Sequence, residues 1–537
     1  MTMDTLASLL ALAAPLLLLA AGLTPSSWAN RHVAAMRSAA TILTIVAFLC
    51  GLAASMMLVG TGSIDVTYVS LPGAPVLNAG VYFDPLSATM LLLITFIGIF
   101  IVRYSLRYLD GDREQGRFLR WILFTLGCVL FLVIARNLLQ FTVAWIVTGL
   151  SLHQLLTHHA NRPWAIWTAR KRFLIASLGD LLLIIGLIAA YVSFGSLDYT
   201  SVFEAAVAMR DESTANTVLV GAIGSLFVIG AMTKSAQFPF HSWLPDTMEA
   251  PTPVSALMHA GIINAGGFLV IRLSPMIVLS DAALGLLATN GAITALLGGI
   301  VMLSQTSVKR SLAFSTIAQM GFMMLQCGLG SFSAALLHIV AHSLYKAHAF
   351  LSSGSVLTVV ARMPPSQSRA FSWKSSIVIS TVSTGIAAAI LSGILFVFGL
   401  HLDEKPGGIV LGLVLVLALS RLISIAAETG IARLALQGVA AAAAVGTLYI
   451  AMFEVSDTIL KETISHQPVT ASPFDIAVSI TACTSFFLMF VITHFIQGFG
   501  HLEWMQSFYI HANNGFYLDI PIRRFTAWAY GERATVS

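Results

Sequence analysis

The chain has 537 residues, of which 57% are hydrophobic and 10% are charged, and its formal net charge at pH 7 is +4. Soluble globular domains carry about 25% charged residues, so this composition excludes a soluble domain and predicts an integral membrane protein.

Apolar runs long enough to cross a bilayer, about 20 residues each, recur along the chain and predict helices rather than barrel strands. We therefore expect an all-α polytopic membrane protein with about 15 transmembrane helices. Their expected cores are 5–23, 38–60, 85–102, 118–135, 138–157, 173–194, 216–238, 253–273, 283–304, 311–329, 332–358, 375–400, 408–428, 434–453 and 473–497.

The distribution of basic residues predicts the orientation. The first 23 residues, MTMDTLASLLALAAPLLLLAAGL, have no basic start and no small-residue cleavage site, so they are expected to be a retained first span. If the loops alternate from an outside N-terminus, most of the 28 Lys and Arg residues fall on one side, whereas the loop 61–84 has none. The positive-inside rule then places the N-terminus outside and the C-terminus in the cytoplasm, in a multi-pass protein of the cell inner membrane.

This topology accounts for the net charge, so no nucleic-acid partner is predicted. The basic segment 103–120, RYSLRYLDGDREQGRFLR, is a topological anchor or, as a less favoured alternative, a docking site for a partner.

The four cysteines are scattered one per span without a CxxC or metal-ligand spacing, and they are expected to be packing residues: Cys50, Cys128, Cys327 and Cys483. No HExxH motif is present, so an enzyme acting by itself is not predicted. No metal site and no cofactor are expected.

The stretch AMTKSAQFPFHSWLPDTMEAPTPVSALMHA, residues 231–260, places Lys234 where a span should be apolar. Four prolines follow this lysine, the first of them at position 239, and each removes a backbone donor. We expect the helix to break there and to open a wet cavity. A desolvated lysine shifts its protonation readily, which suits a group that takes up and releases protons.

Further titratable groups are expected inside the spans. The run LLHIVAHSLYKAHAF has His338, His342 and Lys346 at i, i+4 and i+8, so all three share one helix face at steps of roughly 6 Å. Such a row can relay protons through intervening water. His259 lies in a neighbouring span, and Asp180 in LIASLGDLLLIIGL is the natural ion partner for a buried lysine.

Simpler roles compete with this interpretation. Lys234, Lys346 and Arg421 are the three basic residues expected inside the spans, and each lysine could form a static salt bridge with Asp180 or another acid. Arg421 could extend to the interface or pair with Glu428.

The histidines have alternatives of their own. A single intramembrane histidine such as His259 is often only a hydrogen bond between helices. The HIVAH spacing of His338 and His342 is that of a zinc protease without its glutamate, and the run 153–163, HQLLTHHANRP, has three histidines at a span end without cysteines. Metal binding is not expected at either place.

Three motifs resemble a known family: TKSAQFPFHSWLPDTMEAPTPVSALMHA, SVKRSLAFSTIAQMGFMML and AHSLYKAHAFLSSGSVL. They are similar to the antiporter-like proton-translocating subunits shared by respiratory complex I, Mrp antiporters and membrane hydrogenases. The resemblance implies two inverted repeats of five helices with broken helices and a polar axis along the membrane midplane. The implied domains are N-terminal helices 1–80, an antiporter-like core 81–360, C-terminal helices 361–500 and a cytoplasmic tail 501–537.

The resemblance also implies a proton path. Its members match the family motifs residue by residue: Lys234, Asp180, His259, His338, His342 and Lys346. Two family features are absent, because Trp145 is followed by Ile146 instead of the glutamate expected in the fifth helix, and 375–400 has no channel lysine.

The tail HLEWMQSFYIHANNGFYLDIPIRR, the modest length and the missing glutamate make the chain most similar to the DabB family. This resemblance implies a non-enzymatic, proton-conducting membrane subunit of an inorganic-carbon accumulation system. Its implied partner is DabA, a large cytoplasmic, zinc-containing, carbonic-anhydrase-like subunit that forms bicarbonate from CO2. The alternative is a subunit of a complex I-like or Mrp-type cation/proton antiporter, in which sodium could move as well as protons.

Overall fold

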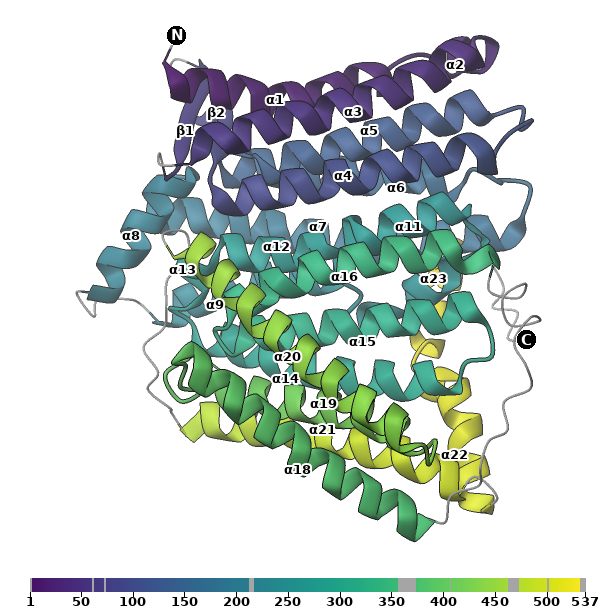
Figure 1. The fold of residues 1–537 in the computed structure, drawn as a ribbon. Coiled ribbons are helices and arrows are strands. Elements are labelled where there is room, and N and C mark those ends of the chain that lie inside the picture. The colour runs from purple at the N-terminus through teal and green to yellow at the C-terminus, as the bar shows by residue number, and fades with distance from the viewer. Residues whose placement is uncertain are drawn as a thin grey trace.

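The computed structural model describes residues 2–531 apart from 60–61, 72–73, 212–216, 356–372, 406, 462–472 and 500–501. Most of the described chain is helical, as predicted, and the long helices run side by side (Figure 1).

Twelve helices of the described chain are long and apolar enough to cross a membrane, by length and composition. They are α1 (Met3–Gly22), α3 (Val33–Leu58), α4 (Pro85–Tyr108), α5 (Gln115–Val133), α6 (Leu138–Leu156), α7 (Pro163–Phe194), α11 (Thr252–Ala260) with α12 (Ala265–Arg272) as one span, α14 (Asp281–Ser304), α18 (Trp373–Phe398), α19 (Gly408–Ala427), α20 (Ala432–Leu460) and α21 (Pro473–Phe499).

The expected count of fifteen spans is therefore not confirmed. The predicted spans outside this set correspond to α9 (Thr217–Lys234), which is a shorter apolar helix, and to α15 (Val308–Gly328) and α16 (Phe332–Ser352). Helix α9 lies outside the set because it is short, whereas α15 and α16 are long enough and carry polar groups of the site described below. The inverted-repeat symmetry and the domain boundaries stay predictions.

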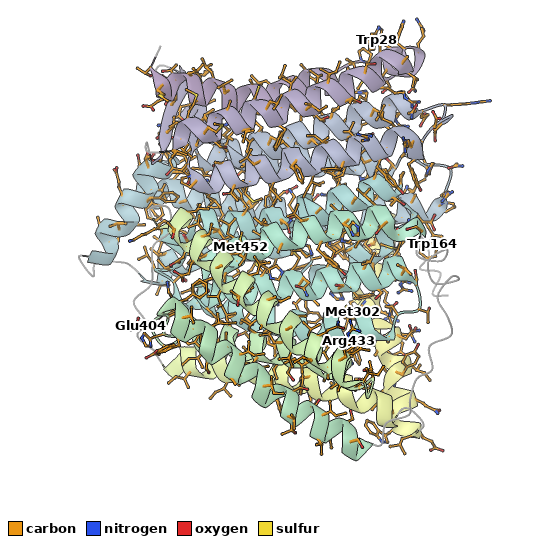
Figure 2. All side chains as sticks on the ribbon, viewed as in Figure 1. Trp28, Trp164, Met302, Glu404, Arg433 and Met452 are labelled. Atoms are coloured by element: carbon orange, nitrogen blue, oxygen red, sulfur yellow. The ribbon has the colours of Figure 1, made fainter. Side chains whose placement is uncertain are left out.

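The loops gather at two ends of the bundle, as the expected alternation of spans requires. In Figure 2, Trp28 and Trp164 lie at one end and Glu404 lies at the opposite end. Both tryptophans are exposed. Tryptophan is enriched where membrane meets water, so these side chains mark an interface at the end that the sequence assigns to the cytoplasm.

The loop 61–84 forms a β-hairpin, which the sequence did not predict. Strands β1 (Ile64–Leu71) and β2 (Ala74–Phe83) pair antiparallel, with Ile64 opposite Phe83.

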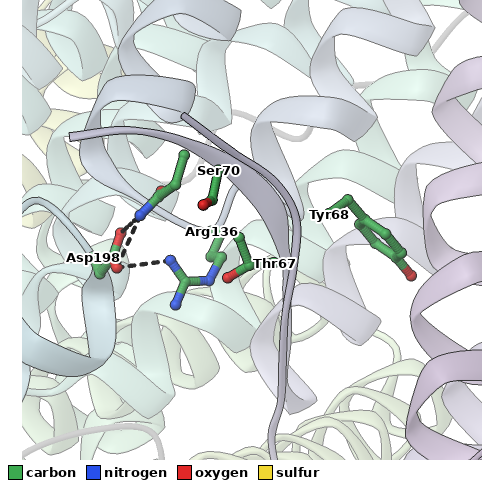
Figure 3. A pocket seen from close by; sticks show the side chains of 6 residues that line it. Thr67, Tyr68, Ser70, Arg136 and Asp198 are labelled. Carbon is green, nitrogen blue, oxygen red and sulfur yellow. Dashed lines mark hydrogen bonds and ion pairs between the residues drawn. The ribbon is translucent and has the colours of Figure 1, made fainter. Parts of the chain in front are cut away.

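An arginine anchors this hairpin to the bundle. Arg136 binds Asp198 at 2.7 Å (Figure 3). It also binds Asp65 at 2.5 Å, and Asn78 of β2 donates to Asp198. The pocket in Figure 3 thus has an arginine already neutralised by two carboxylates, which makes it an anchor and a poor anion site.

A second buried ion pair fixes the start of α4. Asp84 caps the helix by accepting from the Ser87 backbone N–H at 2.9 Å, and it accepts two hydrogen bonds from Arg272, at 2.7 and 2.8 Å. Both side chains are fully buried, and the rings of Tyr82 and Tyr199 lie beside the guanidinium. This bidentate pair joins α4 to the end of α12.

Small residues bring α14 and α15 into close contact. A Cβ added at Gly291 would lie 2.5 Å from the backbone nitrogen of Leu325, and one at Gly321 would lie 2.5 Å from that of Ala295. Close backbone approach of this kind is the usual basis of helix packing in membranes. It fixes the position of α15, which contributes two contacts to the site.

The tail folds back onto the bundle as α22 (Glu503–Asn513) and α23 (Ile520–Ala529), at the end opposite the hairpin (Figure 1). Gln305 donates to the Asn513 carbonyl at 3.1 Å, and the Tyr509 hydroxyl donates to the Ser304 carbonyl at 3.1 Å. These contacts hold the tail against the end of α14.

Replacing Asp84 with alanine should destabilise the fold strongly. The substitution leaves the Arg272 guanidinium buried without its partner, which costs about 3–5 kcal/mol. The midpoint of thermal unfolding in detergent should fall clearly. Asp110→Ala removes an exposed ion pair with Arg37 (2.7 Å) and is the matched control, with no measurable change expected. Equal midpoints for the two variants would contradict this assignment.

Candidate functional site

The predicted helix break at Lys234 is present. Helix α9 ends at Lys234, and the chain continues through Ala236, whose φ is +48°, into a short 3-10 turn (Phe240–Ser242) and α10 (Trp243–Asp246). The Trp243 indole N–H donates to the Thr233 carbonyl at 3.2 Å, which satisfies one acceptor freed by the break.

Lys234 is buried against α6. Its ammonium donates to the backbone carbonyl of Trp145 at 2.8 Å and lies 3.8 Å from the centre of the Trp145 ring. The carbonyl dipole and the ring face both favour a positive charge. Ile146, where the family has its glutamate, belongs to the apolar packing of the core.

Asp180 of α7 lies close to this lysine without touching it. Its carboxylate interacts electrostatically with Lys234 and Arg172 and contacts the Trp145 side chain. No ion pair within 4.0 Å joins Lys234 to Asp180 among the ion pairs of the described residues. A static salt bridge between them is therefore not seen, and Asp180 acts on Lys234 from beyond contact distance.

The expectation that three basic residues lie inside the spans is wrong. The expected cores 118–135 and 253–273 already include Arg120 and Arg272, and α7 begins at Pro163 and so adds Lys171 and Arg172. Lys171, Arg172 and Arg272 are all buried. The run ARKR, residues 169–172, resembles a loop because it is charged, although Pro163 before it is a common helix start.

The second lysine forms a cluster with a histidine from another helix. Lys346 of α16 is fully buried and donates to the Leu312 carbonyl of α15 at 3.0 Å. His259 at the end of α11 shares a hydrogen bond of 3.0 Å with the Thr316 hydroxyl and stacks on Phe350, with ring centres 4.3 Å apart. His259 interacts electrostatically with Lys346. The structure therefore brings these two predicted residues together.

The predicted face of α16 is confirmed. The rings of His338 and His342 stack with centres 6.0 Å apart, which matches one helical turn, and His342 interacts electrostatically with Lys346 and His259. Among the described residues, neither ring nitrogen of His342 nor Nε2 of His338 has a hydrogen-bond partner. Buried polar atoms without a protein partner are the usual places for ordered water.

Polar groups join the two lysine sites. After the Lys234 break, the Ser235 hydroxyl donates to the Ile263 carbonyl at 2.6 Å. In the break after Gly261, the Asn264 amide donates to the Ser343 hydroxyl of α16 at 2.7 Å. We call the line of buried polar groups from Lys234 through Asn264 to Lys346 and His338 the polar thread.

The histidines of 153–163 and Arg421 make packing and ion-pair contacts. His158 lies 3.6 Å from Asp112 and its ring centre is 4.8 Å from that of His159, whereas His153 packs against Phe173, so the three histidines of 153–163 do not form one cluster. No group of three or more His, Cys, Asp or Glu side chains suited to a metal is found in the described part of the chain. Arg421 lies 3.6 Å from Glu428, as predicted.

The tail reaches the segment that follows the first break. Lys171 donates to the Ser242 carbonyl at 3.1 Å and to Asp246 at 2.9 Å, and it also pairs with Asp519 of the tail. Arg523 pairs with Asp519 and lies 3.9 Å from Asp246. Burial raises the pKa of Asp519, but Lys171 and Arg523 lower it more, so this pKa lies below its usual value.

Two protein-family models match the chain. The model described as "NADH:quinone oxidoreductase/Mrp antiporter, TM" matches residues 135–394, and "NADH-Ubiquinone oxidoreductase (complex I), chain 5 N-terminus" matches residues 72–119. The first match contains all six residues of the predicted proton path.

Curated relatives point the same way. Over 498 residues the chain is 38% identical to the probable inorganic carbon transporter subunit DabB2 of Halothiobacillus neapolitanus, covering 91% of this chain and 86% of that protein. Over 271 residues it is 45% identical to the probable inorganic carbon transporter subunit DabB of Hydrogenovibrio crunogenus, covering 50% and 52%. Chloroplastic NAD(P)H-quinone oxidoreductase subunit 5 of Ranunculus macranthus is 40% identical over 282 residues, covering 52% and 38%.

Solved structures share the fold. A chain of the Mrp complex from Dietzia sp. superposes with a TM-score of 0.67 at 24% identity, covering 99% of this chain and 59% of that chain. A chain of the archaeal membrane-bound sulfane sulfur reductase superposes with a TM-score of 0.56 at 17% identity, covering 96% and 99%. The chain therefore has an antiporter-like membrane fold.

Asp519→Asn should loosen α23 from the bundle, because the amide cannot balance Lys171 and Arg523. We expect the hydrogen-exchange protection of the α23 amides to fall several-fold at pH 7. A carboxyl with a depressed pKa stabilises the fold above its ordinary pKa, and this contribution is lost as pH falls through the depressed value. Acidification of the native chain should therefore reproduce the effect.

The exposed Glu503 at the start of α22 gives the matched control, Glu503→Gln. It should leave the protection of α23 unchanged. Unchanged protection in Asp519→Asn would show that the tail is held by its other contacts alone.

Proposed function

This chain belongs to the DabB family of antiporter-like membrane subunits, and we propose that it conducts protons in an energy-coupled inorganic-carbon accumulation complex. It is a multi-pass membrane protein and a transport subunit rather than an enzyme. The proposed role is to let protons flow inward and so to drive a cytoplasmic partner that hydrates CO2 and accumulates bicarbonate.

The observation that carries the proposal is the polar thread. Two buried amines, Lys234 and Lys346, each donate to a backbone carbonyl. His259 and His342 lie beside the second amine, and His338 stacks on His342. An ammonium held by a carbonyl rather than by a carboxylate has no fixed counter-charge in contact with it, so the cost of losing its proton is small compared with that of a tight ion pair. Groups of this kind mark proton relays within membranes.

Inward transfer would follow α16 and then cross to α9. A proton entering near His338 passes to His342 and Lys346 through water, and each donor becomes neutral as the next group is charged. His259 and the Asn264 segment lead on to Lys234, where Asp180 stabilises the arriving charge without holding it in a contact pair. Asp180 thereby takes over the electrostatic role of the glutamate that Ile146 replaces.

The proposed partner is DabA, the large cytoplasmic, zinc-containing, carbonic-anhydrase-like subunit implied by the family resemblance. The zinc chemistry would belong to that subunit. The present chain would contribute the proton flow from the cell inner membrane, with its N-terminus outside and its C-terminus cytoplasmic. Support for this orientation is the excess of Lys and Arg in the loops at the end that holds the tail.

A second candidate is a subunit of a complex I-like or Mrp-type cation/proton antiporter. It is favoured by the fold shared with the Mrp complex and by the identity with chloroplastic subunit 5. In this case the same thread would exchange protons, or sodium, against the other ion.

Lys234→Ala and Lys346→Ala should each abolish energy-dependent uptake of inorganic carbon in cells, because each removes a proton-carrying amine. The abundance of the chain in the membrane should stay normal. Arg310→Gln removes an exposed charge near the start of α15 and should leave uptake unchanged. Disappearance of the lysine variants from the membrane would instead show that the amines are structural.

Copurification separates the two candidate functions. The tagged chain, extracted in mild detergent, should retain one large soluble zinc-containing protein, identified by mass spectrometry and metal analysis. Recovery of several membrane or iron-sulfur subunits instead would establish the second candidate.

A further inference from the structure

A fully buried arginine lies one helical turn from the lysine site. Arg172 of α7 donates to the Gly149 carbonyl of α6 at 2.5 Å, while Lys234 donates to the Trp145 carbonyl of the same helix. Residues four apart on a helix are separated by about one turn, or 5.4 Å along the axis. Two basic side chains from different helices are therefore fixed to successive turns of α6.

These two cations share one carboxylate. The charged or titratable groups that act on Lys234 are Asp180 and Arg172 of α7 and the Cys128 thiol of α5. Asp180 also interacts electrostatically with Arg172. His153 also interacts electrostatically with Arg172 and adds no negative charge. The local net charge is thus +1 when Lys234 is protonated and zero when it is neutral.

Only one of the two cations can change this balance. A guanidinium stays protonated in proteins, whereas an ammonium on a buried lysine is readily deprotonated. Burying a net charge is costly, so the neutral arrangement of Asp180 with Arg172 favours release of the proton from Lys234. The same carboxylate stabilises the ammonium when a proton arrives.

Resting on the proposed function, we infer that Arg172 is a positioning residue that competes with Lys234 for Asp180 and thereby makes the Lys234 proton releasable. When Lys234 is charged, the Asp180 carboxylate interacts with two cations, Lys234 and Arg172. When the Lys234 N–H bond breaks and its proton moves to water, the amine becomes neutral and Asp180 is left to Arg172. No other bond changes, and the cycle restarts with the next proton.

A purely structural role would also place Arg172 here, since its hydrogen bond to Gly149 joins α7 to α6. The two roles differ in the pH dependence of proton flux. Loss of the Arg172 charge should shift the pH optimum upward, because protonated Lys234 is then opposed by no neighbouring cation. Loss of the Asp180 charge should shift it downward. Neighbouring charges within a few ångströms shift protonation equilibria by about 1–3 pH units.

The test compares proton flux at a series of pH values. The chain is purified with its bound partners, reconstituted in liposomes with a pH-sensitive dye inside, and driven by an imposed membrane potential. We expect the optimum of Arg172→Gln to move up by about one pH unit and that of Asp180→Asn to move down. Arg162→Gln, which removes an exposed ion pair with Glu249 (3.0 Å) at the start of the same helix, should keep the native optimum.

The outcomes distinguish this inference from the function on which it rests. Absence of flux in the native complex would overturn the proposed function. Native flux together with reduced flux but an unshifted optimum in Arg172→Gln would overturn the inference alone and leave Arg172 as a structural anchor. If Arg172→Gln does not accumulate in the membrane, Arg172→Lys replaces it. A buried lysine at position 172 can itself lose its charge, so the inference predicts a smaller upward shift of the pH optimum for Arg172→Lys. An unchanged optimum contradicts the inference.

Discussion

The structure depends on the cost of holding positive charge inside a membrane. An uncompensated ammonium there costs from a few to more than ten kcal/mol, depending on the reference state. At Lys234 the chain lowers this cost with a backbone carbonyl, an aromatic face and a carboxylate that is near but not in contact. The helix ends at this residue, and the amine meets a backbone carbonyl of the neighbouring helix α6 rather than lipid. The buried charge of Lys234 and the end of helix α9 therefore occur at the same place.

Other buried charges, unlike that of Lys234, form contact ion pairs that join helices and lie outside the proposed proton path. Arg272 with Asp84 and Lys171 with Asp246 are contact pairs with short hydrogen bonds. Such pairs have little freedom to change protonation, and they tie α12 to α4 and α7 to α10. Two broken spans would be loose on their own. The fixed pairs hold the segments that follow the breaks, α10 against α7 and α12 against the start of α4.

The sequence was most informative where polar residues interrupt apolar runs. Lys234, Asp180 and the α16 row stand out because nothing in a lipid-facing helix requires them, and helical spacing alone predicted that His338 and His342 share one face of α16. Arg172 escaped notice because the start of α7 is charged and resembles a loop. Arg272 was missed at the last position of its span, and its partner Asp84 is distant in sequence. No local pattern reports such pairings.

The two departures from the family pattern have different consequences. At position 146 the compensation that we propose lies within the site, because Asp180 interacts with Lys234 from α7 while the Trp145 carbonyl and ring hold the amine from α6. In α18 nothing similar occurs. That helix runs unbroken from Trp373 to Phe398, and 375–398 has no charged side chain. Over the described residues of α18, no titratable side chain extends the polar thread, and the histidine row of α16 runs along its helix toward the end assigned to the outside. A proton path in this chain would be shorter than one that continues into the next helix, and it would reach the outer surface beside α16.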